Sequence, residues 1–250
     1  MLAREGGAHY NPDCKQFPRL VTPRNISLMA KKSFSQAVGK PPVKRTPRPA
    51  MTHQVRIIGG LWKRTPLPVL EAEGLRPTPD RVRETVFNWI NHLTDGAWER
   101  MACLDLFAGT GVLGFEAASR GAKQVVMVET HTPAVRQIDA TKEKLRADQV
   151  SVIRGDALST TQNMLARGQG KAFNLIFLDP PYNQNWLEKI LPHCAPLLAN
   201  DGLLYVESEE SLVSDTPPDW LAGWEIVRAD NAGMVFYHLL QLQKAPEVQA

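Results

Sequence analysis

The chain has 250 residues, of which 43% are hydrophobic, and its formal net charge is +3. This size and composition suit one α/β domain with some additional sequence. They exclude a membrane-spanning protein, because no apolar run approaches 18 residues, and the first residues lack the apolar core of a signal peptide.

The N-terminal part differs from the rest in charge. Residues 1–50 hold 10 Lys and Arg against 2 Asp and Glu, whereas the other 200 hold 19 against 24. The stretch "GKPPVKRTPRPA" shows no helical or strand period, so we predict that residues 1–50 form a disordered basic tail and that residues 244–250 are also disordered. A polyanion partner, a solvated tail without one, and a start codon assigned upstream of Met29 or Met51 all fit this composition.

Residues 51–95 predict an extension made of a hairpin and a helix. In "HQVRIIGGLWKRTPLPV" two short β-prone runs flank Gly59 and Gly60. In the next segment Thr78 is expected to cap a helix with Pro79 at its first position. Five residues at helical spacing then predict a buried face: Val82, Val86, Trp89, Ile90 and Leu93.

Basic residues are dense in the same extension. They are Lys63, Arg64, Arg76, Arg81 and Arg83. A solvated polar edge and a phosphate-facing, RNA-binding patch both account for this density, and we carry the second forward as a prediction.

Residues 96–243 alternate between strand and helix. The apolar strands are "ACLDLF", "QVVMVE", "VSVIR", "NLIFLD" and "GLLYVES", and helices are expected near 111–120, 133–147, 157–167 and 185–199. This order predicts a parallel sheet covered on both faces. The chain ends differently, because "WEIVRAD" and "MVFYHLLQL" flank a tight turn and therefore predict an antiparallel hairpin.

A glycine-rich turn follows the first of these strands. Gly109, Gly111 and Gly114 form G-x-G-x-x-G between a strand and a helix, the setting of a nucleotide-type ligand. Glu129 ends the next strand, 20 residues after Gly109, where it can accept hydrogen bonds from a ribose. Asp156 follows the third strand, where it can hold an adenine amino group or cap a helix.

A dinucleotide and S-adenosylmethionine both fit these features. Asp105, just before the glycines, suits the ammonium and sulfonium of S-adenosylmethionine and would repel a pyrophosphate. The terminal antiparallel hairpin is foreign to the all-parallel dinucleotide fold. An NAD-dependent oxidoreductase is therefore disfavoured.

The segment "NLIFLDPPYNQNW" ends a buried strand with Asp179, Pro180, Pro181 and Tyr182. Ligands of an open parallel sheet bind beyond the carboxyl ends of its strands. The Asp179 carboxylate and the Pro180 carbonyl can form a rigid pair of acceptors for an exocyclic NH2, and Tyr182 can stack on the base, a contact worth roughly 1–3 kcal/mol. A strand end stiffened by prolines, with no catalytic role, is the structural alternative.

These motifs resemble class I S-adenosylmethionine-dependent methyltransferases that act on amino groups of bases. The stretches "VRIIGGLWKRTPLPV", "LRPTPDRVRETVFNWI" and "LLYVESE" are similar to the bacterial small-subunit ribosomal RNA guanine-N2 methyltransferase D family over about residues 54–242. The resemblance implies a cytoplasmic enzyme that needs no metal and acts on one guanine of 16S rRNA or of the small subunit. It also implies a Rossmann-like, seven-stranded, mostly parallel sheet with an antiparallel last strand.

The resemblance also implies roles for individual residues. Asp179, Pro180, Pro181 and Tyr182 would hold the target base. The cofactor site would consist of Asp105, Phe107, Gly109, Gly111, Gly114, Glu129, Asp156 and Ala157. Two alternatives remain open at this point: a DNA adenine-N6 methyltransferase, which uses the same four-residue motif, and a non-catalytic RNA-binding protein on the same fold.

Overall fold

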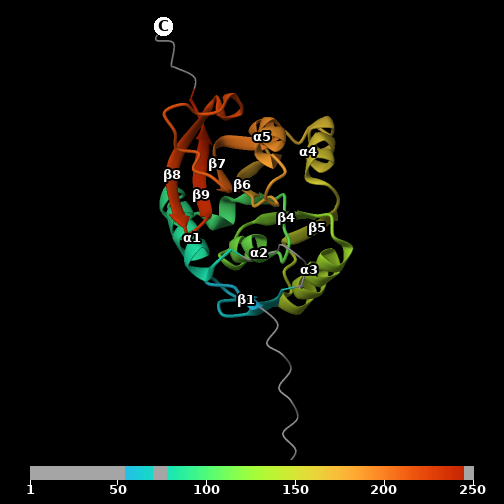
Figure 1. Ribbon diagram of the computed structural model, residues 1–250. Helices are drawn as coiled ribbons and strands as arrows, with labels where there is room; N and C mark the ends of the chain where they lie inside the picture. The colour runs from blue at the N-terminus through green and yellow to red at the C-terminus, as the bar shows by residue number, and fades with distance from the viewer. Residues whose placement is uncertain (1–53, 70–77, 245–250) are drawn as a thin grey trace, which may run out of the picture. The chain divides into compact units, whose positions relative to one another are not determined.

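The computed structural model of the protein describes residues 54–69 and 78–244 (Figure 1). The predicted tail of residues 1–50, Arg76, and all but the first residue of the predicted C-terminal segment 244–250 lie outside the described residues.

Seven strands form the main sheet, in the order β5-β4-β3-β6-β7-β9-β8. The first five along the chain are parallel to one another: β3 (Ala102–Asp105), β4 (Gln124–Glu129), β5 (Val150–Arg154), β6 (Phe173–Leu178) and β7 (Leu198–Ser208). Strand β9 (Val235–Leu242) pairs antiparallel with β7, and β8 (Trp224–Ala232) pairs antiparallel with β9. The predicted mostly parallel sheet and its terminal hairpin are confirmed.

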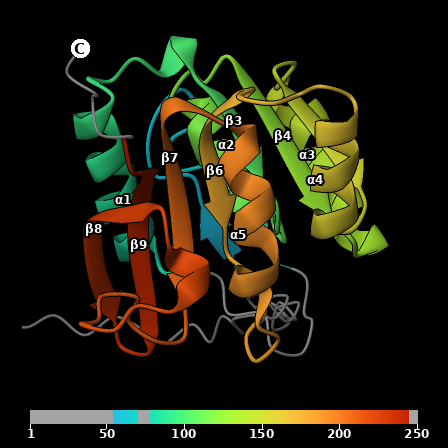
Figure 2. The ribbon, with the colours of Figure 1, turned by 90° about the horizontal axis from the view of Figure 1, so that it is seen from above.

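Helices cover both faces of this sheet (Figure 2). On one face the core contains residues of α1 (Asp80–Leu93), α2 (Val112–Ser119) and α3 (Thr132–Leu145). On the other face it contains residues of α4 (Ala157–Ala166), α5 (Trp186–Leu197) and the short 3₁₀ helix η2 (Asp219–Leu221). A second 3₁₀ helix, η1 (Trp98–Arg100), precedes β3.

Strand alternation decides which side chains reach which face. Phe177 and Tyr205 lie in the core beneath α1 and α2, whereas Leu178 and Val206 lie in the core beneath α4 and α5. Because the period of a strand is two residues, the next side chains on the α1 and α2 side belong to positions 179 and 207. The fold therefore directs both of these acids toward the start of α1.

The N-terminal extension begins with a two-stranded hairpin of β1 (Gln54–Arg56) and β2 (Pro66–Pro68). The predicted pairing is confirmed, although the loop between the strands runs from residue 57 to 65. A Cβ on Gly60 would lie 1.9 Å from the Ser119 carbonyl oxygen, and the φ of Gly60 is +72°. Glycine is thus required here, because the loop backbone touches the end of α2.

Glu116 fastens this loop to the domain. Its carboxylate is fully buried and accepts hydrogen bonds from the amides of Ile58 (2.6 Å) and Gly59 (2.8 Å) and from Arg120 Nε (2.8 Å). All eight residues of α2 are buried, since the sheet covers one side of the helix and the loop contacts the other. A charged residue in this helix is therefore explained by the donors that surround it.

We predict that Glu116→Ala lowers the free energy of unfolding by about 3 kcal/mol, because it leaves two amides and the Arg120 guanidinium without their acceptor. Urea unfolding measures the change. Glu143→Ala, at an exposed position of α3, is the matched control and is expected to stay within about 0.5 kcal/mol of the original protein. Equal effects of the two substitutions would contradict this account.

Candidate active site

The predicted acids gather at one edge of the sheet. Asp105 ends β3, Glu129 ends β4, Asp156 follows β5 and Asp179 follows β6. These are the carboxyl ends of four parallel strands, where open α/β sheets bind their ligands.

The glycine turn after β3 has the backbone that its sequence predicts. Gly109 and Gly111 have φ angles of +51° and +77°, a region that favours glycine. A Cβ on Gly114 would lie 2.4 Å from Met127 Cε, so this glycine permits α2 to pack on β4. Phe107, at the start of the turn, is half-buried and meets the Trp186 ring edge-on at 5.3 Å.

Glu129 braces the glycine turn. Its Oε2 accepts from the Gly109 amide (2.7 Å), and its Oε1 accepts from the His131 amide (2.7 Å). Oε1 also accepts from the Thr130 hydroxyl at 3.4 Å, so Oε2, with one of its two lone pairs unused by the described residues, retains capacity for a ribose hydroxyl. Ribose binding by Glu129 stays a prediction.

Asp156 has a structural role in addition to its predicted one. It caps α4, and its Oδ1 accepts from the Ser159 amide at 2.9 Å. Ala157 is the buried first residue of that helix. The contact with adenine stays a prediction for both residues.

Asp105 is a buried acid with one oxygen that lacks a hydrogen-bond donor in the part of the chain that the structure describes. Its Oδ2 accepts from the Gly114 amide at 3.2 Å, while Oδ1 has no hydrogen-bond partner among the described residues. Burial raises the pKa of this carboxyl to about 7, an effect that the backbone amides of Gly114 and Phe107 oppose and the Glu129 charge reinforces. A cation at Oδ1 would satisfy the oxygen and favour its charged form, so these residues fit the ammonium of S-adenosylmethionine.

Asp179 lies beside a second carboxyl that the sequence analysis did not assign to the site. The Thr78 hydroxyl is 2.7 Å from Glu207 Oε1 and 3.3 Å from Asp179 Oδ2, and the Tyr205 hydroxyl donates to Glu207 Oε1 at 2.8 Å. Burial, followed by the charges of Glu207 and Asp105, holds the pKa of Asp179 well above its usual range. The carboxyl groups of Asp179 and Glu207 therefore offer more hydrogen-bond acceptors than the Thr78 and Tyr205 hydroxyls can satisfy.

The expected role of Thr78 as a helix cap is wrong. Helix α1 begins at Asp80, its cap is Pro79, and no side chain caps it. The Thr78 hydroxyl instead bonds to the two acids. The position of Glu207 in "LLYVESE" could have indicated its place in the site. It lies near the end of the fifth parallel strand, and Asp179 directly follows the fourth.

The predicted surface position of Arg83 is also wrong. Arg83 is fully buried, and its guanidinium donates to the carbonyls of Arg56 (2.8 Å) and Thr78 (3.2 Å) and to Asp80 Oδ1 (2.5 Å). It joins the hairpin to the start of α1 and holds Thr78 in place. A buried guanidinium with this set of acceptors cannot also contact phosphate.

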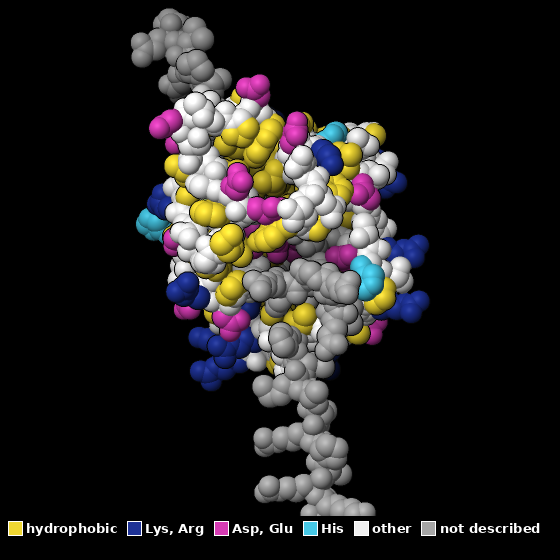
Figure 3. Space-filling view, viewed as in Figure 1, with side chains coloured by type: hydrophobic (Ala, Val, Ile, Leu, Met, Phe, Trp, Pro, Cys, Tyr) yellow, Lys and Arg dark blue, Asp and Glu magenta, His cyan; other side chains and the backbone are white. Residues whose placement is uncertain are grey.

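The remaining basic residues are on the surface. Arg81 is exposed in the first turn of α1, and Lys63 and Arg64 are exposed in the hairpin loop, near the end of α2. Figure 3 shows Lys and Arg side chains gathered at the lower left of one face, with acidic side chains nearer its centre. Phosphate contact by Lys63, Arg64 and Arg81 stays a prediction.

A cavity of about 760 Å³ opens beside the Asp-Pro-Pro-Tyr segment. Pro180, Tyr182, Trp186 and Glu207 are among its lining residues. Pro180 is buried, whereas the Tyr182 side chain is 41% exposed. The volume is ample for one nucleoside, and an aromatic ring at its mouth suits a planar base.

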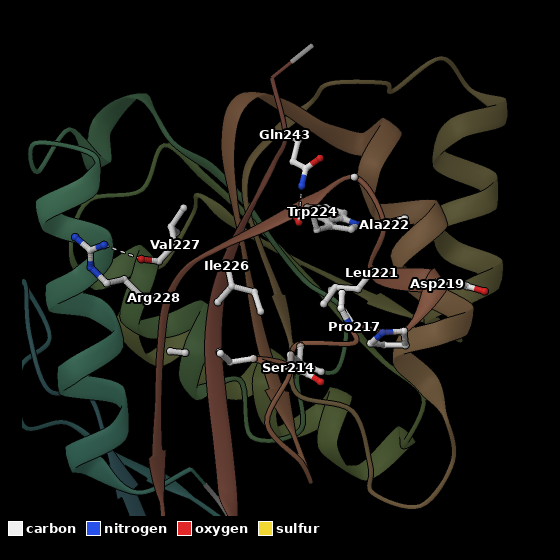
Figure 4. A pocket seen from close by; sticks show the side chains of 15 residues that line it. Ser214, Pro217, Asp219, Leu221, Ala222, Trp224, Ile226, Val227, Arg228 and Gln243 are labelled. Atoms are coloured by element: carbon white, nitrogen blue, oxygen red, sulfur yellow. Dashed lines mark hydrogen bonds between the residues drawn. The ribbon is translucent and has the colours of Figure 1, made fainter. Parts of the chain in front are cut away.

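A second cavity, of about 500 Å³, lies along the edge strand β8 (Figure 4). It shares Leu212, Ser214 and Pro218 with the first, so the segment 212–218 forms a wall between them. Buried His238 supports this wall, because its Nε2 accepts from the Leu212 amide at 3.1 Å. Burial lowers the pKa of His238 to about 4, so the imidazole is neutral and able to accept.

Several other features concern only the described residues. Within residues 54–69 and 78–244, no cluster of His, Cys, Asp and Glu has the composition and spacing to hold a metal ion. The helices of these segments are too short or too polar to cross a membrane. Cys103 and Cys194 are buried free thiols.

The sheet order, the glycine turn and the acids at the strand ends define a class I S-adenosylmethionine-dependent methyltransferase. The family model described as "Conserved hypothetical protein 95" matches residues 55–241. The chain is 38% identical to Ribosomal RNA small subunit methyltransferase D of Escherichia coli strain K12 over 208 residues, which are 82% of this chain and 99% of that protein. It belongs to the ribosomal RNA small subunit methyltransferase D family.

Two further comparisons agree with this assignment. Ribosomal RNA small subunit methyltransferase D of Haemophilus influenzae is 37% identical over 204 residues, which are 80% of this chain and 100% of that protein. The solved structure of yhhF from Escherichia coli matches with a TM-score of 0.63 and 35% identity, covering 76% of this chain and 99% of that one.

Asp105→Asn is expected to change how stability depends on pH. The folded-state pKa of about 7 lies above the ordinary 3.8, so Asp105 favours the folded state below about pH 4, and this contribution is lost as the pH rises through 7. The unfolding free energy of the Asn variant, relative to the original protein, should therefore rise by up to about 4 kcal/mol between pH 4 and pH 8.

Urea unfolding at several pH values measures this difference, and parallel profiles for the two proteins would refute it. Calorimetry at pH 8 should show weaker binding of S-adenosylmethionine to the variant, because the carboxylate that faces the cation has been lost.

Proposed function

We propose that the protein transfers a methyl group from S-adenosylmethionine to the exocyclic N2 amine of one guanine in 16S rRNA. The observation that carries this proposal is the position of Asp179. It follows β6, the strand next to β3 with its buried Asp105, and its neighbour Pro180 lines a cavity of nucleoside size. The ribosomal RNA substrate is taken from the names of the related proteins.

The chemistry needs a well-held amine. An aryl amine is a poor nucleophile, because its lone pair is delocalised into the ring. Two acceptors on its hydrogens, the Asp179 carboxylate and the Pro180 carbonyl, can fix the nitrogen so that its lone pair points at the incoming carbon. Positioning of this kind supplies several kcal/mol of barrier reduction, and a carboxylate stabilises the positive charge that develops on nitrogen.

Cofactor binding is assigned to the other end of the site. Asp105 and the glycine turn would hold the methionine part, Glu129 the ribose, and Asp156 with Ala157 the adenine. Bound S-adenosylmethionine supplies an electrophilic methyl group on a positively charged sulfur. Asp105 would thus bind the cofactor, and Asp179 would bind the amine.

RNA would reach the site across the N-terminal extension. Arg81 lies in the first turn of α1, while Lys63 and Arg64 lie beside the C-terminal end of α2. The eight residues of α2 span about 12 Å, so a single RNA backbone could contact both places. This proposal places the enzyme in the cytoplasm with the ribosomal subunits.

Asp179→Ala should reduce single-turnover methyl transfer by roughly 10²-fold or more, the scale for losing one preorganised electrostatic partner. Asp179→Asn keeps one acceptor oxygen and should retain partial activity. Transfer by the original protein should rise with pH through the raised pKa of Asp179, because only the carboxylate accepts fully, and Asn at this position should remove that part of the profile.

The measurement is methyl transfer from labelled cofactor to rRNA, to small subunits and to DNA, followed by identification of the modified nucleoside. Asp139→Ala, an exposed acid on α3, is the control. Near-normal transfer by the Ala variant at position 179 would contradict the mechanism. A methyl group found on adenine in DNA would show that the substrate is DNA and not rRNA.

A further prediction concerns the hairpin loop. Exchanging Lys63 and Arg64 for Gln should flatten the salt dependence of RNA binding by about 1.8 in the log–log slope, or about 1.4 for single-stranded RNA, since two phosphate contacts are lost. Arg136 and Lys144, exposed on α3, give a control pair of equal charge. Identical slopes for the two double variants would remove the loop from the RNA-binding surface.

A further inference from the structure

Glu207 is placed as a partner of Asp179. The sheet register pairs Leu178 of β6 with Val206 of β7, so the next residues along the two parallel strands, Asp179 and Glu207, come side by side. Glu207 is only 3% exposed, and its side chain lies on the α1 side of the sheet, as that of Asp179 does, where the Thr78 hydroxyl lies within hydrogen-bond distance of both acids. A base whose amine meets Asp179 would therefore also meet Glu207.

The two oxygens of Glu207 have different surroundings. Oε1 accepts from the Thr78 hydroxyl at 2.7 Å and from the Tyr205 hydroxyl at 2.8 Å. Oε2 accepts no hydrogen bond from the described residues. Arg83, fixed behind Thr78, adds a positive charge that favours the ionised form against the effect of burial. The surroundings thus orient this carboxylate by one oxygen and leave the other for a donor.

A structural role alone explains this arrangement poorly. Burying a carboxylate is costly unless donors satisfy it, and here the Thr78 hydroxyl has one proton for two acids. Asp105 Oδ1, a third buried acceptor nearby, is also unpartnered within the described chain. A ligand rich in N–H donors would resolve the excess of acceptors.

Guanine offers such donors on one edge. Its N1–H lies next to its N2 amine, and N1–H and one N–H of the amine are nearly parallel, while the second N–H of the amine points towards the N3 side. On the corresponding edge of adenine, N1 is an acceptor and only the amine donates. With the amine on Asp179 and the Pro180 carbonyl, either N1 or N3 would face Glu207, and a carboxylate favours the edge that carries N1–H over the lone pair of N3.

We propose that Glu207 is a specificity-determining residue, whose Oε2 accepts the N1–H of the target guanine and rejects a base that carries a lone pair at N1. This inference rests on the proposed function, since it presupposes transfer to a base amine at Asp179. A site that hydrogen-bonds a substrate N–H rejects an analogue without it strongly, because a buried charge is then left unpaired.

The substitution Glu207→Gln should reverse this preference. The Thr78 and Tyr205 hydroxyls need an acceptor, so the amide oxygen takes the place of Oε1 and the NH2 group takes the place of Oε2. An NH2 group opposes the N1–H of guanine but can donate to an unprotonated N1. The variant should therefore disfavour guanine and accept 2-aminopurine, which keeps the amine at C2 and has a lone pair at N1.

The test uses small-subunit RNA assembled with either guanine or 2-aminopurine at the position that the original protein methylates. The original protein should prefer guanine in kcat/KM by about 10²-fold or more. In the Gln variant the ratio should fall to about 1 or below. Equilibrium binding of the two RNAs should shift in the same direction, and S-adenosylmethionine affinity should be unchanged.

Two results would overturn the inference. Equal transfer to both RNAs by the original protein is the first, and it requires no variant to fold. The second is a Gln variant that loses activity equally on both RNAs, as expected if Glu207 only supports the fold. Glu225→Gln, an exposed acid on β8, is the control and should leave the ratio unchanged.

Failure of the proposed function would look different. In that case the original protein would transfer no methyl group to the guanine RNA, or the product would carry its methyl group elsewhere than on N2. The inference about Glu207 would fall with it.

Discussion

The structure depends on holding three carboxyl groups together where two of them, on Asp105 and Glu207, are buried and the third, on Asp179, is half-buried. Asp105, Asp179 and Glu207 meet at the ends of three neighbouring strands, and burial raises the pKa of each carboxyl. Such a group destabilises the folded chain unless donors accompany it. Much of the surrounding architecture supplies these donors, from the Gly114 amide in the glycine turn to the Thr78 and Tyr205 hydroxyls.

The N-terminal extension therefore helps to position the donors around these acids. Arg83 holds the Thr78 carbonyl on one side and the Arg56 carbonyl of the hairpin on the other. Glu116 then ties the hairpin loop to α2, whose first residues follow the glycine turn. A continuous set of hydrogen bonds thus connects the outer hairpin with the acids at the strand ends, so the geometry of the site depends on how firmly the extension docks.

The sequence predicted the features that local patterns encode. Strand and helix alternation, the glycine spacing and the Asp-Pro-Pro-Tyr motif led to the sheet and to four acids at its edge. Thr78, Arg83 and Glu207 were misjudged or missed because their roles arise from contacts between distant segments. Thr78 meets Glu207 across 129 positions, and nothing local distinguishes it from a cap. Arg83 stands among other arginines in the sequence, and only the fold shows that it is buried while Arg81 is exposed.

Gly60 illustrates what this dependence means for sequence change. With the Ser119 carbonyl oxygen only 1.9 Å from where a Cβ would stand, any other residue at position 60 would act as a wedge between loop and helix. The loop would be displaced, and the adjoining Arg56 carbonyl would shift with it. That carbonyl accepts a hydrogen bond from Arg83, which also donates to the Thr78 carbonyl. One methyl group at the contact between loop and helix would thus misalign the Thr78 hydroxyl without touching Asp179 or Glu207.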